Sequence, residues 1–142
     1  MELVRHLLAQ KPVGVVSIDP GATVLDAIGL MAKHETGSVL VMRGKSLLGI
    51  LSERDYTRKV ALKGRASATT PVSEIMSTPV VTVAPDETIQ RCMKVMTERR
   101  FRHLAVVDNG QVIGVVSIGD LVKAMLELQQ QEIAQLQQYI SS

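Results

Sequence analysis

The chain has 142 residues, of which 46% are apolar and 21% charged, a balance typical of a folded globular protein rather than a disordered one. Its net charge of +2 is too small to indicate a surface for nucleic acid or membranes, and 2% aromatic residues leave few rings on which bases could stack. No apolar run approaches the roughly 18 residues of a membrane span. We therefore expect neither nucleic acid nor a membrane as a partner.

The single cysteine, Cys92, excludes an internal disulfide and favours a reducing compartment. The first residues lack the basic start and the long apolar run of a signal peptide. These features predict a cytoplasmic protein with Cys92 in its core.

The first half of the chain predicts a β-α-β-β-α unit, preceded by a short helix at residues 3–8. A β-rich run at 15–18 ends at a proline-containing turn, and apolar residues three and four apart then predict a helix that buries Val24, Ile28 and Met31. Two apolar runs, 39–42 and 47–51, flank a short turn and predict a hairpin. A closing helix is expected to begin near Glu53.

The second half repeats this order of elements after a small, polar linker at 64–70 and a short predicted helix at 72–76. The strand at 80–83 leads into a helix with Ile89, Met93 and Met96 on one face. Asn109 and Gly110 mark the following hairpin, because an Asn-Gly pair accepts the positive φ angles that such turns require. The closing helix is expected to begin near Ile118.

An offset of 65 residues aligns segment 15–55 with segment 80–120 without a gap, so the chain is an internal tandem repeat. One βαββα unit of this size leaves a face of its sheet bare, and two units can cover it jointly. The prediction is an α/β (α+β) fold in which the two repeats pack face to face about a pseudo-twofold axis. We place the domains at 10–66 and 72–128, together one module, with a helical tail at 129–142.

The tail carries apolar residues at heptad spacing, interrupted by Gln129. This pattern is typical of a helix that pairs with a second copy, although a helix folded back on its own module fits it equally well. The members of the stripe are Val122, Leu126, Ile133, Leu136 and Ile140.

The two repeats share a glycine, a serine and an aspartate at the start of the closing helix: Gly49, Ser52 and Asp55 in the first, and Gly114, Ser117 and Asp120 in the second. Together with the order of elements, this motif resembles the CBS domain, and the tandem resembles the Bateman module of small bacterial signal-transduction proteins. The resemblance implies a regulatory protein rather than an enzyme. Such proteins are often described as related to inosine monophosphate dehydrogenase, but the catalytic barrel of that enzyme would need about 250 residues.

The resemblance also implies two clefts for an adenosyl ligand, in which the aspartate accepts hydrogen bonds from ribose hydroxyls and the glycine lets the ligand approach the backbone. The first cleft would combine Ser52, Arg54 and Asp55 with Val80, Val81, Arg102 and His103. The second would combine Ser117, Gly119 and Asp120 with Val15, Val16, Gly37 and Ser38.

Arg102 and His103 align with basic residues that meet phosphates in nucleotide-binding members of the family, whereas the matching positions in the first repeat are Gly37 and Ser38. The first cleft is therefore expected to bind phosphorylated ligands more tightly, and S-adenosylmethionine is disfavoured. Alanine at position 105 replaces the proline that usually follows these basic residues. Neighbouring Arg99 and Arg100 fit a solvated helix end as well as a phosphate contact.

The spacing Ser-x-x-Asp has a simpler explanation, a capping box that begins a helix, and Thr23 and Asp26 have the same spacing without implying a ligand. The repeat context favours ligand binding, and the two roles are compatible.

Our hypothesis from the sequence is a homodimeric sensor that binds AMP, ADP, ATP or an NAD-type dinucleotide as a regulatory ligand and has no catalytic cofactor. The alternatives are a scaffold protein with vestigial clefts and a nucleotide-processing enzyme. The three histidines lack metal-ligand spacing, and no hydrolase, P-loop or dinucleotide motif is present. We therefore expect neither catalytic residues nor a metal site.

Overall fold

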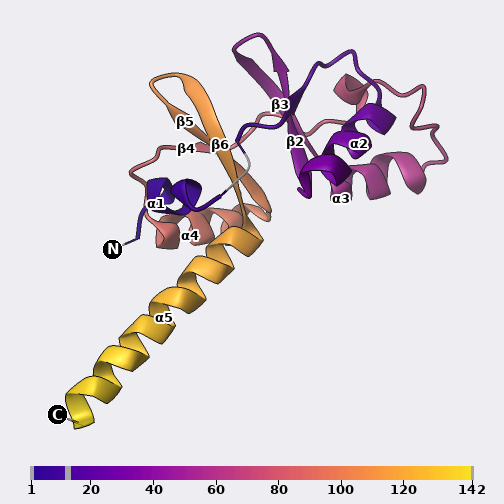
Figure 1. Cartoon of the computed structure of the whole chain (residues 1–142). Helices are drawn as coiled ribbons and strands as arrows, with labels where there is room; N and C mark the ends of the chain where they lie inside the picture. The colour runs from indigo at the N-terminus through magenta and orange to yellow at the C-terminus, as the bar shows by residue number, and fades with distance from the viewer. Residues whose placement is uncertain (1, 12–13, 142) are drawn as a thin grey trace.

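The computed structural model describes residues 2–11 and 14–141. Each repeat forms a three-stranded sheet, with strand order β1-β2-β3 in the first and β4-β5-β6 in the second, and the two sheets lie beside each other (Figure 1). The first repeat comprises β1 (Ser17–Ile18), α2 (Val24–His34), β2 (Ser38–Arg43), β3 (Ser46–Ser52) and α3 (Glu53–Tyr56), followed by the π-helical turn η1 (Thr57–Ala61). The second comprises β4 (Thr82–Val83), α4 (Ile89–Arg99), β5 (His103–Asp108), β6 (Gln111–Ser117) and α5 (Ile118–Ser141).

The strand pairing is the same in both repeats, which confirms the predicted α+β fold of two βαββα units. The first strand pairs parallel with the second, and the hairpin is antiparallel. A register shift lies between Val41 and Met42, and its counterpart lies 65 residues later, between Val106 and Val107. The hairpin turns use positive φ at Gly44 and at Asn109 and Gly110, as the turn residues predict.

The helix faces follow the predicted periodicity with one adjustment. In α2, Val24 and Met31 are buried as expected, but Ile28 is only partly buried, and Ala27, three residues after Val24, is fully buried instead. In α4, Cys92 is fully buried, whereas Met93 is only partly covered. The position three residues after Ile89 faces the sheet more directly than the position four residues after it.

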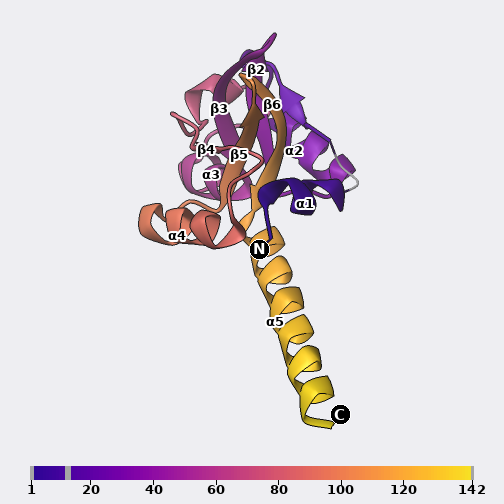
Figure 2. The same ribbon diagram turned by 90° about the vertical axis from the view of Figure 1, so that its left-hand side faces the viewer.

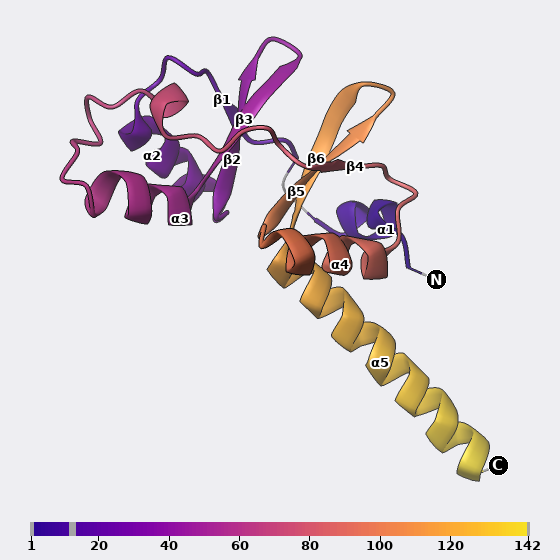
Figure 3. The same cartoon turned by 180° about the vertical axis from the view of Figure 1, so that it is seen from behind.

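The two repeats exchange the segments that precede them. The first helix, α1 (Val4–Ala9), packs on the second repeat, where Val4 and Leu7 join its core. The short 3-10 helix η2 (Val72–Glu74) precedes the second repeat but packs on the first, where Val72 and Ile75 are buried. Figures 2 and 3 show α1 beside α4 and β6. Each hydrophobic core is thus assembled from segments far apart in the sequence.

The last helix, α5, is continuous over 24 residues and projects away from the module (Figure 1). Leu121 and Ala124 anchor its first turns in the second core, whereas Ile133, Leu136 and Ile140 are more than half exposed. The alternative of a tail folded back on the module is therefore wrong. Ser142, the last residue of the expected tail, lies outside the described residues. None of the helices in the described ranges is both long and apolar enough to cross a membrane.

Candidate functional site

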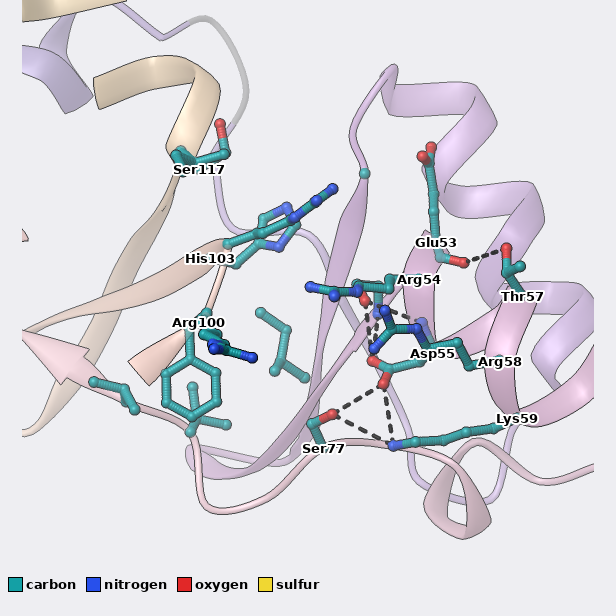
Figure 4. Close-up of a pocket in the computed structure, with 18 of the residues that line it drawn as sticks. Glu53, Arg54, Asp55, Thr57, Arg58, Lys59, Ser77, Arg100, His103 and Ser117 are labelled. Atoms are coloured by element: carbon teal, nitrogen blue, oxygen red, sulfur yellow. Dashed lines mark hydrogen bonds and ion pairs between the residues drawn. The ribbon is translucent and has the colours of Figure 1, made fainter. Parts of the chain in front are cut away.

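A cavity of about 990 Å³ lies between the two repeats (Figure 4). One wall comes from the start of α3 and from η1, and the other from the connection between α4 and β5. All seven residues predicted for the first cleft line it: Ser52, Arg54, Asp55, Val80, Val81, Arg102 and His103.

Asp55 uses its two carboxylate oxygens for different purposes. Its Oδ2 accepts the backbone N–H of Ser52 at 3.0 Å, while the N–H of Asp55 donates to Ser52 Oγ at 3.2 Å. This is the capping box that begins α3, so the simpler explanation of the motif holds. Its Oδ1 accepts the hydroxyl of Ser77 at 3.0 Å and lies 3.1 Å from the ammonium of Lys59. Capping therefore leaves one oxygen of Asp55 available for tertiary contacts.

The polypeptide that crosses between the repeats brings Ser77 to this carboxylate. Ser77 pairs with Ile50 at the end of β3 through two backbone hydrogen bonds of 2.8 and 3.0 Å. A Cβ atom on Gly49 would lie 2.6 Å from the sulfur of Met76 and 3.0 Å from the carbonyl oxygen of Ser77. We expected this glycine to admit a ligand. Instead, it admits the crossing segment, as Gly114 does for Leu8 in the other repeat.

Four arginines line the same cavity from opposite sides. Arg54 and Arg58 lie one helical turn apart on the α3 and η1 side, and Arg100 lies on the facing side (Figure 4). Arg102 lines the cavity from the same connection between α4 and β5 as Arg100. Arg100 ends α4 in a left-handed conformation with φ of 59°. Of the two arginines that also fitted a solvated helix end, Arg100 lines the cavity and Arg99 does not.

The pKa values of two groups at the cavity are lowered. The pKa of Arg54 is lowered from its ordinary value, chiefly by repulsion from Arg58. The pKa of His103 is also lowered, first because the ring is desolvated by burial and then because Lys11 lies close to it. His103 is therefore neutral at pH 7 and offers one hydrogen-bond donor and one acceptor.

The second predicted cleft is a smaller space of about 190 Å³, and Lys11 lies across it. The ammonium of Lys11 donates to Asp120 Oδ2 at 2.8 Å and to the carbonyl of Val115 at 2.8 Å. Burial raises the pKa of Asp120, but the hydrogen bonds from Lys11 and Ser117 outweigh it and lower the pKa overall. The ammonium therefore holds the carboxylate that we expected to face a ribose.

Five of the seven residues predicted for the second cleft line this space: Val16, Gly37, Ser38, Ser117 and Asp120. The other two lie elsewhere. Val15 is 40% exposed, because successive residues of an extended segment point to opposite sides. Gly119 lies in the first turn of α5 and lines a shallow apolar groove on the outer side of that helix. His103 lines both spaces.

Several side chains at these sites are not apparent from the motifs, among them Lys11, Arg58, Lys59 and Ser77. The sequence could have indicated two of them, because Arg58 and Lys59 follow Arg54 and Asp55 by four residues and residues four apart lie on the same face of a helix. Lys11 and Ser77 have no such signal, since the exchange of segments between the repeats brings them to the aspartates.

Comparison with known proteins agrees with this architecture. The family model described as "CBS domain" matches residues 4–62 and 72–127. The CBS domain-containing protein CBSX3, mitochondrial, of Arabidopsis thaliana is 39% identical over 123 residues, which are 83% of this chain and 60% of that protein.

Solved structures agree as well. A putative signal-transduction protein with CBS domains from Burkholderia ambifaria is 43% identical with a TM-score of 0.84, over 89% of this chain and 95% of that one. The CBS domain protein PAE2072 from Pyrobaculum aerophilum, solved in complex with AMP, is 26% identical with a TM-score of 0.76, over 91% of this chain and 99% of that one. The chain belongs to the CBS domain family and carries two CBS domains in tandem.

Proposed function

We propose that this protein is a regulatory module that binds an adenine nucleotide in the cavity between its two CBS domains. The observation that carries the proposal is the joining of Asp55 from one repeat with Arg102 and His103 from the other around a single space. A carboxylate suits the paired hydroxyls of a ribose, and an arginine beside a neutral histidine suits a phosphate. The AMP complex of the structurally similar Pyrobaculum protein supports this assignment.

Each part of a nucleotide has a complementary set of side chains in the cavity. The ribose hydroxyls would donate to Asp55, in place of the hydroxyl of Ser77 on Oδ1. The base would lie against apolar residues that line the cavity between the crossing segment and β3, namely Ile50, Pro79, Val80 and Val81. The phosphate would lie toward the arginines. Binding would regulate by favouring the arrangement of the two repeats in which both walls reach the ligand.

We also propose that the protein acts as a homodimer that uses the exposed stripe of α5. Val122 and Leu126 already lie on the outer side of this helix where Leu121 and Ala124 anchor its inner side. The apolar stripe therefore begins on the module and runs along the projecting part of the helix. A long helix with an exposed heptad stripe is stabilised by a second copy.

A ligand screen by thermal unfolding tests the binding proposal. Adenosine, AMP, ADP, ATP and NAD are compared with S-adenosylmethionine and with guanine and pyrimidine nucleotides. A ligand at about 100 times its dissociation constant stabilises the fold by roughly 2.7 kcal/mol. We expect this effect from adenine nucleotides and much less from the others. An equal response to all bases, or none, contradicts the proposal and favours a scaffold with vestigial clefts.

The Asp55→Asn variant tests the ribose contact, and Asp26→Asn is its matched control. Asp26 forms the same capping box with Thr23 at the start of α2 but does not line the cavity. Both variants should lose some helix-capping stability, and only Asp55→Asn should weaken adenosine and AMP by at least tenfold in titration calorimetry. Equal losses in the two variants would indicate a structural role alone. Incubation of purified protein with each nucleotide tests the enzyme alternative, and turnover would contradict a purely regulatory role.

A further inference from the structure

The charges that line the cavity do not balance. Arg54, Arg58, Lys59, Arg100 and Arg102 face only two carboxylates, Glu53 and Asp55, which leaves a surplus of three positive charges. His103 adds no charge at pH 7, because its pKa is lowered by burial and by nearby Lys11. The lining of the cavity is therefore strongly cationic, although the whole chain carries a net charge of only +2.

Partners within the protein do not neutralise this surplus. The carboxylate of Asp55 is held by the capping box, by Ser77 and by Lys59, which also donates to the carbonyl of Ile75 at 3.0 Å. Over the described residues, none of the four arginine side chains in the cavity forms a salt bridge or a hydrogen bond. Four arginines thus line a common space without a hydrogen-bond or salt-bridge partner among the described residues.

The arginines also act on one another. Arg58 and Arg102, which come from different repeats, both lower the pKa of Arg54 by repulsion. Arginines one helical turn apart, such as Arg54 and Arg58, repel each other even on an isolated helix. An anion between the two walls would relieve this mutual repulsion.

We propose that the cavity selects adenine nucleotides that carry two or more linked phosphates over AMP. The inference deepens the proposed function and rests on it. A single phosphate carries about two negative charges near pH 7 and can engage one pair of guanidiniums. Each further phosphate adds charge and acceptor oxygens for the remaining pair.

The position of the arginines indicates how a phosphate chain would run. Arg102 borders His103 at the start of β5, where the first phosphate is expected. Arg58 and Arg100 lie on the two facing walls and are free to take the next phosphates. A cavity of about 990 Å³ lies at the upper end of the range of about 300 to 1,000 Å³ for small-molecule sites, so its size accommodates the longer ligands.

The first experiment compares dissociation constants of adenosine, AMP, ADP, ATP and NAD by titration calorimetry, without magnesium so that the phosphates keep their charge. We expect ADP or ATP to bind at least tenfold more tightly than AMP, and the advantage to shrink as salt is raised. NAD carries its two phosphates inside the molecule, whereas ADP and ATP carry theirs at one end. Comparison of NAD with ADP and ATP therefore shows which of the two forms the cavity prefers. AMP binding as tightly as all three longer ligands overturns the inference and leaves the proposed function intact.

The second experiment uses the double variant Arg58→Gln, Arg100→Gln, with Arg99→Gln as the control. Arg99 adjoins Arg100 but does not line the cavity. The double variant should reduce the ratio of ATP affinity to AMP affinity by at least tenfold, whereas the control should leave this ratio unchanged. The unfolding temperature of the double variant without ligand should not fall, because the repulsion among the arginines is reduced. An equal loss for AMP and ATP overturns the inference.

Inorganic tripolyphosphate separates this inference from the proposed function. If tripolyphosphate binds and no adenine nucleotide does, the proposed adenine site is refuted and the phosphate-chain site is upheld. If adenine nucleotides bind equally well whatever their number of phosphates, the proposed adenine site is upheld and the phosphate-chain site is refuted.

Discussion

The same residue motif has different consequences in the two repeats. Asp55 and Asp120 both cap the helix that follows them, through equivalent hydrogen bonds to a serine. Asp55 binds Ser77 and Lys59 through its other oxygen, Oδ1, beside a cavity of about 990 Å³. Asp120 binds Lys11 through the capping oxygen itself, Oδ2, in a space of about 190 Å³. A capping aspartate is therefore a ligand-binding candidate only where its tertiary neighbours leave room. On this basis we expect one primary nucleotide site per chain.

Replacement of Lys11 by methionine should open the second space. Removal of the ammonium frees the carboxylate of Asp120 for ribose hydroxyls, while the methionine side chain retains apolar length. Calorimetry should report one adenosine per wild-type chain and a second, weaker adenosine in Lys11→Met. This second site should gain little from a phosphate, because Gly37 and Ser38 replace the arginine and histidine there.

The matched control is Lys45→Met, an exposed lysine in the hairpin turn of the first repeat. It should leave the stoichiometry at one. Two equal sites in the wild-type protein would contradict the blocking role that we assign to Lys11.

At the scale of elements, the exchange of the leading segments organises both the cores and the sites. The backbone of Ser77 pairs with β3, and this pairing fixes its hydroxyl against Asp55. The side chain of Leu8 lies over Gly114 in the equivalent place on β6. The repeated glycine is thus explained by the close approach of a crossing segment.

The two glycine sites should differ in their tolerance of a methyl group. A Cβ atom on Gly49 would meet the backbone carbonyl of Ser77 at 3.0 Å as well as the side chain of Met76, whereas one on Gly114 would meet the end of the Leu8 side chain at 2.8 Å. Leu8 can rotate away more easily than a paired backbone can shift. We expect Gly49→Ala to lower the free energy of unfolding by about 1–3 kcal/mol and Gly114→Ala to lower it by less.

Urea unfolding of the two variants measures this difference, with Gly29→Ala as the control. Gly29 lies within α2, and a methyl group there would meet no atom of another element within 4 Å, so alanine should stabilise the helix by about 0.5–1 kcal/mol. Gly49→Ala should also weaken nucleotide binding, because a displaced Ser77 no longer positions Asp55. A greater loss of stability at Gly114 would refute our explanation.

At the scale of the whole molecule, the projecting α5 gives the protein a long apolar stripe outside its core. The buried Leu121 and Ala124 lie on the opposite side of this helix from Val122 and Leu126. The helix can therefore keep its contact with the module while a second copy covers the outer stripe. Gln129 lies within the seam and favours pairing in one register.

Truncation after Leu128 should weaken the proposed homodimer, because it removes Ile133, Leu136 and Ile140 from the stripe. Light scattering over a dilution series should show the truncated chain becoming monomeric at a higher concentration than the full chain. Ile133→Glu should have a similar effect, whereas Gln131→Glu adds the same charge on the opposite face and should not. An unchanged mass in the truncated chain would show that other surfaces make the dimer.

Local sequence patterns are sufficient to predict the elements and their repetition. Alternating and helical apolar spacing, the Asn109-Gly110 turn and the Ser-x-x-Asp caps act over a few residues, so their local structure follows from local physics. The offset of 65 residues then identified the equivalent positions, and with them the aspartate and the basic pair that face each other in the large cavity.

The size of each space, and the lysine or serine that contacts each aspartate, could not be predicted from such patterns and follow from long-range packing. Lys11 is 109 residues from Asp120, and Ser77 is 22 residues from Asp55. Contacts at such separations depend on the exchange of segments between the cores, which buries Val4 and Val72 in the opposite repeats. The energy of that burial is spread over two whole cores and leaves no short pattern in the sequence, because hydrophobic contacts have no direction or fixed spacing along the chain.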